Sequence, residues 1–330
     1  MILMVKFIKD VSNPYDFYGK LRLIKDISHF NENEIDLLDN FLKTIYPVNY
    51  NNFKNDNIYY YVGNGLRQSL ISFLLTQLKL KKDKNQKKEI VVYIKKPNYF
   101  EIYNICDLIP NIILTDDKTS PEIDIEYICP VSNPSGSVND PESNAKIIFY
   151  DFVYNNEIYI DKEQIIPKDI IQEREVIITT SIGKLTGDVN LRISISFSNS
   201  KEIIRNLWKH YKSTIGILAI ADWEKFKEKS DHLIKNKDSI IKKNKAIIEN
   251  NRNKLKNIPW YKYNIEIIKP SDKQGSRLWI RKTDNSDITK FFMTKNILLS
   301  HGLIFNASKE YTRISLYSKD FVDTVVRELS

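Results

Sequence analysis

The segment TTSIGKLTGDVNLRISISF, residues 179–197, contains two strand-like runs separated by a lysine and an arginine. The runs are rich in β-branched and aromatic residues, which is typical of strands that are buried on both faces. Lys184 follows the first run, and Arg192 opens the second. A lysine at the end of a buried strand costs free energy unless it is paired or used covalently, so we expect Lys184 to have a chemical role.

Similar runs recur through the first 197 residues and predict a seven-stranded sheet. They are residues 58–62, 89–95, 111–115, 125–129, 146–151, 175–181 and 192–197. Gly65 opens an apolar-periodic helix between the first two runs. Strands that alternate with helices favour a mostly parallel sheet that is covered on both sides.

After Phe197 the pattern changes to longer helices. Residues 200–213 predict one helix, and residues 215–257 predict a second, long helix with breaks. Pro259 marks a boundary, beyond which short strands and helices follow one another in a smaller unit.

The predicted fold is therefore α/β, with a three-layer large domain and a smaller α+β C-terminal domain. A chain of 330 residues, of which 42% are apolar, is long enough for both. We expect an N-terminal segment that packs on both domains over residues 1–50, the large domain with a long interdomain helix over residues 51–257, and the small domain over residues 258–330.

The composition argues against several classes of protein. The formal net charge is +8, but the basic residues are diffuse and mixed with Asn, Asp and Ile at helical spacing, which favours solvated helix faces over a nucleic-acid surface. Cys106 and Cys129 are too few for a disulfide framework and lack metal-ligand spacing. No apolar run is long enough for a bilayer, and the first residues lack a secretory signal. We therefore expect a cytoplasmic protein without a metal.

Polar residues follow the carboxyl ends of the predicted strands, where open α/β folds place their chemistry. The turn VGNGLRQS, residues 62–69, enters a helix N-terminus whose N–H groups suit a phosphate. Tyr99 follows the second strand, Asn133 lies in a turn after the fourth, and Asp151 ends the fifth, three residues before Tyr154. A carboxylate that closes a buried strand needs a partner. Turn chemistry or core packing explains the other features equally well when each is taken alone.

Taken in order, these features match one pattern. The glycine turn and the motifs Pro-x-Tyr, Asn-Pro-x-Gly, Asp-x-x-Tyr, Ser-x-x-Lys and Lys-x7-Arg together resemble the fold type I pyridoxal-phosphate enzymes, the aspartate-aminotransferase-like superfamily. The segments YYYVGNGLRQSL, PVSNPSGSVNDP, FYDFVYNNEIY, GKLTGDVNLRISIS and the C-terminal stretch around Arg313 are similar to the alliinase and tryptophan-aminotransferase-related family. The resemblance is weakest over residues 19–57 and 215–290.

The resemblance implies pyridoxal 5'-phosphate as the cofactor and gives three residues catalytic roles. Lys184 would form a Schiff base with the cofactor and then move the α-proton of the substrate. Asp151 would keep the pyridine nitrogen protonated. Tyr154, together with Asn133, would bind the phenolic oxygen of the ring.

The other implied roles concern binding. Tyr99 would stack on one face of the ring, and Val153 would pack on the other. The phosphate would be bound by the backbone of Gly65, Leu66 and Arg67, the hydroxyl of Ser181 and the guanidinium of Arg192. The substrate would be bound by Arg313, which would hold its α-carboxylate, and by Asn133.

Three residues depart from the family's pattern. Gly183 stands where a serine usually precedes the lysine, and Asn190 and Ser194 replace glycines on either side of the Leu-Arg pair. Because the residues with chemical roles are retained, we interpret these departures as drift or retuning rather than a loss of catalysis.

The reaction type stays open between two classes. One is an aminotransferase that moves an amino group between an L-amino acid and a 2-oxo acid. The other is a lyase or cyclase of specialised biosynthesis, similar to the carbon–sulfur lyase alliinase. Two cysteines exclude the cysteine-rich module of plant alliinases, which favours the aminotransferase. A homodimer is implied by the resemblance, and a basic nucleic-acid-binding protein is the distant alternative.

Overall fold

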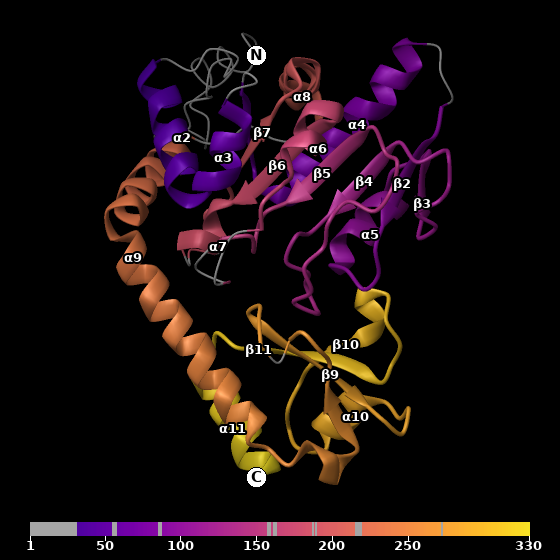
Figure 1. The fold of residues 1–330 in the computed structure, drawn as a ribbon, viewed down its shortest axis with the longest axis vertical. Helices are drawn as coiled ribbons and strands as arrows, with labels where there is room; N and C mark the ends of the chain where they lie inside the picture. The colour runs from indigo at the N-terminus through magenta and orange to yellow at the C-terminus, as the bar shows by residue number, and fades with distance from the viewer. Residues whose placement is uncertain are drawn as a thin grey trace, which may run out of the picture.

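The computed structural model describes residues 32–54, 58–84, 88–156, 160, 164–186, 188, 190–214, 220–271 and 273–330. Residues 1–31, which make up most of the predicted N-terminal segment, lie outside the described residues. The chain forms a seven-stranded sheet and a four-stranded sheet. Figure 1 shows the larger sheet above the smaller one, with the helix α9 (Ile220–Lys256) running along one side of both. The predicted α/β fold with a second, smaller unit is confirmed.

The seven strands of the large sheet coincide with the seven predicted runs. They are β1 (Tyr59–Gly63), β2 (Ile90–Ile94), β3 (Ile112–Thr115), β4 (Ile125–Ile128), β5 (Ile147–Asp151), β6 (Glu175–Ser181) and β7 (Ser194–Ser198). Their order is β1-β7-β6-β5-β4-β2-β3. β7 is antiparallel to both of its neighbours, and the remaining pairs are parallel. The carboxyl ends of β4, β5 and β6 therefore meet at one edge of the sheet.

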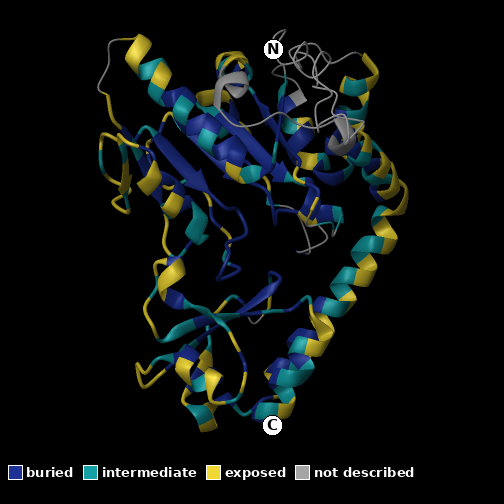
Figure 2. Ribbon diagram, turned by 180° about the vertical axis from the view of Figure 1, so that it is seen from behind, coloured by how far each residue is buried: buried dark blue, intermediate teal, exposed yellow. Residues whose placement is uncertain are grey.

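Helices cover both faces of this sheet, which gives the predicted three layers. One face packs against α2 (Glu32–Ile45), α3 (Pro47–Lys54), α6 (Lys168–Glu173) and the first part of α9. The other face packs against α4 (Leu66–Asp83), α5 (Phe100–Leu108) and α8 (Lys201–Thr214). Side chains alternate between the two cores along each strand, as Ile148 and Phe149 of β5 do. Figure 2 accordingly shows the central strands of this sheet in the colour of buried residues.

The small sheet is antiparallel and has the order β10-β11-β9-β8. Its strands are β8 (Ile265–Ile267), β9 (Arg277–Lys282), β10 (Ser300–His301) and β11 (Tyr311–Ser315). The short helix η3 (Trp260–Tyr263) leads from α9 into β8, and η4 (Gly302–Phe305) lies between β10 and β11. Side chains of α10 (Ile288–Met293), α11 (Lys319–Leu329) and the end of α9 complete the core of this sheet.

The long helix differs from its prediction in one respect. α9 is continuous from Ile220 to Lys256, so the predicted breaks are wrong over that range. The physical reason is visible in the sequence, because this range contains neither glycine nor proline. Among the described residues, no helix is both long enough and apolar enough to cross a bilayer.

Arg252 of α9 fixes the segment that leads into the small sheet. Its guanidinium is buried and donates to the carbonyl of Ser271 at 2.9 Å, to that of Gln274 at 3.2 Å and to that of Gly275. The Gln274 side chain in turn donates to the carbonyl of Gly136, in a loop of the large sheet, at 3.0 Å. A Cβ on Gly136 would lie 3.0 Å from the Gln274 carbonyl oxygen, so the two backbones approach closely here.

Arg252→Met is expected to lower the free energy of unfolding by about 3 kcal/mol, because largely buried carbonyl groups lose a charged donor. Urea unfolding followed by circular dichroism measures the loss. Lys256→Met is the matched control, since Lys256 is exposed in the last turn of the same helix. Equal unfolding midpoints for the two variants would contradict the role given to Arg252.

Candidate active site

A cavity of about 810 Å³ lies at the carboxyl ends of the large-sheet strands and reaches the small sheet. Every residue predicted from the sequence for the cofactor or the substrate lines it. These are Gly65, Leu66, Arg67, Tyr99, Asn133, Asp151, Val153, Tyr154, Ser181, Lys184, Arg192 and Arg313. Residues separated by up to 248 positions thus share one cavity, because strand ends of the large sheet meet at one edge and the small sheet brings Arg313 to that edge.

Asp151 is a desolvated carboxyl at the end of β5, with 4% of its surface exposed. The Tyr127 hydroxyl donates to Oδ2 at 2.6 Å, and the Val153 N–H donates to Oδ1 at 3.0 Å. Burial raises the pKa of Asp151 to about 6, and these two hydrogen bonds only partly oppose it. A cationic N–H donor that enters the cavity would therefore stabilise the charged carboxylate.

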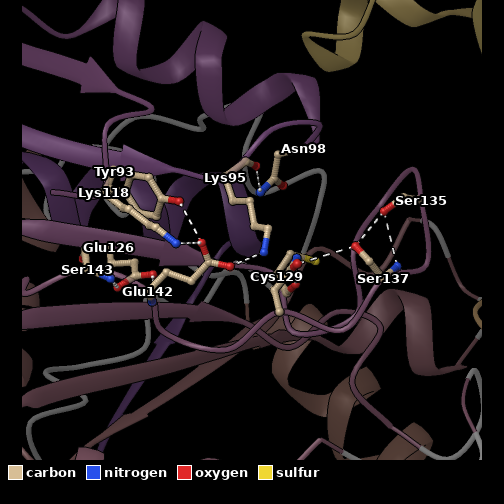
Figure 3. Close-up of polar contacts among 11 residues, drawn as sticks. Tyr93, Lys95, Asn98, Lys118, Glu126, Cys129, Ser135, Ser137, Glu142 and Ser143 are labelled. Atoms are coloured by element: carbon tan, nitrogen blue, oxygen red, sulfur yellow. Dashed lines mark hydrogen bonds and ion pairs between the residues drawn. The ribbon is translucent and has the colours of Figure 1, made fainter. Parts of the chain in front are cut away.

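The loop that carries Asn133 is fixed at both ends. The buried Glu126 carboxylate of β4 accepts from the N–H groups of Glu142 at 2.8 Å and Ser143 at 3.1 Å, and from the Ser143 hydroxyl at 2.7 Å. Figure 3 shows this contact beside the ion pair of Lys95 with Glu142. At the other end the Asn139 side chain donates to the Cys129 carbonyl at 3.0 Å. These contacts hold the loop at its two ends, and Asn133 itself accepts a hydrogen bond from Arg313 in the cavity wall.

The N-terminus of α4 opens into the cavity. Gly65 precedes the helix with a φ of 86°, and no side chain caps the first turn. The space in front of Gly65 is open, since a Cβ there would meet nothing within 4 Å. Unpaired N–H groups and the helix dipole make such an end an anion site. The Arg67 side chain turns aside to donate to the Tyr99 hydroxyl at 3.2 Å and to pair with Glu101.

Lys184 lies in the cavity wall, but its environment differs from the expected one. β6 ends at Ser181, and the chain turns into the short helix α7 (Ile182–Thr186) that carries the lysine. The Lys184 side chain is exposed rather than buried, as is that of Arg192. A side chain on the helix beyond the strand end reaches the open cavity instead of the core, so the amine is accessible and not desolvated.

Two arginines of the small sheet complete the wall. Arg313 of β11 is paired in register with Trp279, and Arg277 of β9 is paired with Ser315. Arg313 Nη1 donates to Asn133 Oδ1, and Arg277 Nη2 donates to the Tyr154 hydroxyl at 2.6 Å. Burial and the neighbouring charge of Arg277 lower the pKa of Arg313 to about 10. Each arginine thus connects the small sheet to a side chain of the large one.

The same arrangement of sheets and helices occurs in solved structures of known enzymes. An aminotransferase from Staphylococcus aureus superposes with a TM-score of 0.70 at 17% identity, over 99% of this chain and 88% of that chain. A PLP-bound C-S lyase from Staphylococcus hominis superposes with a TM-score of 0.68 at 14% identity, over 92% and 80%. This chain has the fold of the fold type I pyridoxal-phosphate enzymes.

Two further comparisons complete this result. A Thermus thermophilus aspartate aminotransferase mutant superposes with a TM-score of 0.68 at 12% identity, over 98% of this chain and 92% of that chain. No protein-family model and no curated protein sequence matches the chain. The likeness is therefore one of fold, and the alliinase-related subfamily is not confirmed by it.

The structure explains two of the departures from the fold type I pattern. A Cβ on Gly183 would lie 2.6 Å from the Asp188 carbonyl oxygen and 2.7 Å from that of Leu191, so the backbone after the lysine leaves room only for glycine. The Ser194 hydroxyl is buried and lies 2.7 Å from that of Ser69 on α4, with which it shares a hydrogen bond. Asn190 is exposed in a turn. The glycine at position 183 and the serine at position 194 therefore both follow from the packing of this chain.

Two residues with contacts to the predicted site were not identified from the sequence. The sequence SRLWIRK, residues 276–282, is typical of a strand that packs on the core, yet Arg277 of that strand lines the cavity. Its signal was an arginine at the start of an apolar strand. Tyr127 is the second such residue. A buried tyrosine needs a partner for its hydroxyl, and Asp151 is that partner.

Gly183→Ala is expected to destabilise the protein by about 1–3 kcal/mol, because the new methyl group would overlap two backbone carbonyls. Thermal unfolding of the cofactor-free protein measures the loss. Asn190→Gly, a change in the same loop at an exposed position, is the control and should alter stability by less than about 1 kcal/mol. An unchanged melting temperature for Gly183→Ala would contradict the close approach.

The raised pKa of Asp151 predicts a pH dependence of stability in the cofactor-free protein. Because the folded-state pKa lies above the ordinary value, the contribution of Asp151 is complete below about pH 4 and is lost as the pH rises through about 6. Asp151→Asn removes this loss, keeps an acceptor oxygen for the Val153 N–H and places an amide N–H₂ group where it can donate to the Tyr127 hydroxyl oxygen. Between about pH 5 and pH 8 the variant should gain about 1–2 kcal/mol relative to the unmodified protein.

Urea unfolding at several pH values tests this expectation. Asp169→Asn is the control, because Asp169 is exposed on α6 and its substitution should leave the pH profile unchanged. Parallel profiles for Asp151→Asn and the unmodified protein would show that Asp151 titrates normally.

Proposed function

We propose that the protein is a pyridoxal-phosphate-dependent aminotransferase that moves an amino group between an L-amino acid and a 2-oxo acid. One observation carries the proposal. The buried Asp151 carboxyl, the exposed Lys184 amine and the uncapped N-terminus of α4 line the same cavity, and each suits a different part of this cofactor. The fold shared with aminotransferases and a C-S lyase supports it.

The donors and acceptors of the cavity fit pyridoxal 5'-phosphate. The α4 N-terminus offers unpaired N–H groups, and Ser181 and Arg192 add a hydroxyl and a guanidinium, a combination that suits a phosphate dianion. At the floor of the cavity the desolvated Asp151 carboxyl suits a protonated pyridine nitrogen. When bound, the cofactor would supply a ring that accepts the electron pair left as a bond to the substrate α-carbon breaks.

The residues of the chain would supply orientation and proton transfer. Lys184, accessible on α7, would hold the cofactor covalently and later move the proton at the substrate α-carbon. Asp151, fixed by Tyr127 and the Val153 N–H, would hold a proton at the pyridine nitrogen. Because that proton is shared with a desolvated carboxylate, it would stay on the nitrogen near neutral pH.

The remaining wall would clamp the ring and the substrate. Tyr99 and Val153 would cover the two ring faces, and Tyr154 and Asn133 would bind the phenolic oxygen. Arg313 would hold the substrate α-carboxylate through its guanidinium, with Asn133 fixing its orientation. Holding that carboxylate decides which bond at the α-carbon stands perpendicular to the ring, and so which bond breaks.

Elimination at the β-carbon is the second candidate function. A PLP-bound C-S lyase has this fold with a TM-score similar to those of the aminotransferases, and lyase chemistry would use the same lysine and carboxylate. Aminotransferase remains our first proposal, because this activity is named more often than C-S lyase among the solved structures of similar fold.

Four finer assignments also stay proposals. We place the chain near the alliinase and tryptophan-aminotransferase-related family, on the motifs that carry that resemblance. We further propose a cytoplasmic homodimer, an amino acid and a 2-oxo acid as its substrates, and domain limits at about residues 50 and 257.

The proposal predicts a yellow protein after incubation with the cofactor, with absorbance at about 420 nm that borohydride removes, as a lysine Schiff base should give. Lys184→Ala should lack this band and lose activity by about 10⁴-fold, because the amine provides both the link and the proton transfer. Lys168→Ala, at an exposed site on α6, is the control and should behave as the unmodified protein.

A panel of L-amino acids then separates the two reactions. An aminotransferase should turn over only when a 2-oxo acid is added, and it should yield one new amino acid for each 2-oxo acid consumed. Steady release of ammonia and a 2-oxo acid from one amino acid alone would establish the lyase instead. A protein that binds no cofactor would overturn both.

A further inference from the structure

Arg277 contacts Tyr154 in two ways. Its Nη2 donates to the Tyr154 hydroxyl oxygen at 2.6 Å, and its guanidinium carbon lies 4.3 Å from the centre of the Tyr154 ring. The arginine is itself held, because its Nη1 donates to the Ser276 hydroxyl at 3.0 Å and its guanidinium lies 5.5 Å from the ring of Tyr317. With 9% of its surface exposed, Arg277 is a desolvated cation in the wall of the cavity.

The strand register places Arg277 beside Arg313. Because Arg277 is opposite Ser315 and Arg313 is opposite Trp279 on the antiparallel partners β9 and β11, the two arginines are diagonal neighbours on one face of the small sheet. They reach two different residues of the large sheet, Tyr154 and Asn133. Under the proposed function, these two residues are the ones that would bind the phenolic oxygen of the cofactor.

We propose that Arg277 is a positioning residue that acts through Tyr154 and sets the ionisation of the bound cofactor. The inference rests on the proposed function and deepens it. Because Arg277 donates to the Tyr154 oxygen, the hydroxyl hydrogen of Tyr154 must point to another acceptor, which would be the phenolic oxygen of the ring. A cation on the acceptor side strengthens that donation.

Other charged and titratable groups act on the same region. Arg313 of β11 and Tyr317 of the segment after it interact with both Arg277 and Tyr154. Tyr99, in the loop before α5, interacts with Arg313, and Cys129, directly after β4, interacts with Arg277. Asp151 and Lys184 line the same cavity. The test must therefore separate the effect transmitted by Tyr154 from the summed field of these groups.

The direction in which Arg277 shifts the pH of the spectral change follows from its positive charge. The bound cofactor carries more negative charge on its phenolic oxygen after its link to Lys184 loses a proton. Donors and cations near that oxygen favour the deprotonated form, so Arg277 lowers the pH at which the visible spectrum changes. Loss of Arg277 should raise that pH by about one unit, as expected when a neighbouring charge is removed.

The experiment is a pH titration of the visible absorption of the cofactor-loaded protein. Arg277→Met should shift the midpoint upward by about one unit, while Arg277→Lys, which keeps the charge, should stay closer to the unmodified protein. The same Arg277→Met change is then made in a Tyr154→Phe background. If Arg277 acts through the hydroxyl, its effect there should fall to less than about half, as in a double-mutant cycle.

The outcomes are distinct. An unshifted midpoint in Arg277→Met, or an equal shift with and without the Tyr154 hydroxyl, overturns the role of Arg277 and leaves the proposed function standing. A protein without a visible band in its unmodified form overturns the proposed function and this inference together. Circular dichroism checks folding, and Arg277→Gln replaces Arg277→Met if the latter does not fold.

Discussion

The Asp151 carboxylate is held out of water at the end of the central strand β5, and the organisation of the cavity follows from that constraint. A buried charge must be supplied with donors, and Tyr127 and the Val153 N–H provide two of them. Burial still outweighs these hydrogen bonds, since the pKa of Asp151 is raised. The structure therefore keeps an acceptor with unused capacity facing an open cavity. A site with this property stores electrostatic free energy that a cationic ligand group can release.

The segment after Lys184 shows how packing and chemistry constrain each other. The chain leaves β6 at Ser181, makes a short helix and returns as β7, so its backbone passes close to itself at Gly183. The residue before the lysine must be glycine for that reason alone. Ser194, at the start of the returning strand, uses its hydroxyl to join β7 to α4. The glycine at position 183, which the sequence alone suggests is drift or retuning, is therefore required by the local backbone geometry.

The small sheet contributes to the site through charge rather than through shape alone. Arg252 of α9 fixes the backbone carbonyls of Ser271, Gln274 and Gly275, shortly before β9, and β9 begins with Arg277. Arg277 and Arg313 then reach Tyr154 and Asn133. Two guanidinium groups on one face repel each other, and this repulsion adds to the effect of burial, which lowers the pKa of Arg313. Cation–π contacts with neighbouring aromatic rings and hydrogen bonds to oxygens offset that repulsion. The two positive charges in the cavity wall favour the binding of a carboxylate.

The sequence by itself determined the large sheet and many of the residues that meet in the cavity. Continuous apolar runs mark buried parallel strands, and the polar residues that follow them must share one edge, so Asp151, Tyr154 and Lys184 could be placed together without coordinates. The tertiary structure decided what depends on packing. The exposure of Lys184 and the need for glycine at position 183 follow from the path of the backbone after β6. The partnership of Tyr127 with Asp151 exists only once β4 and β5 lie side by side, and the contact of Arg277 with Tyr154, across 123 positions, exists only once the two sheets have packed, so no local periodicity encodes them.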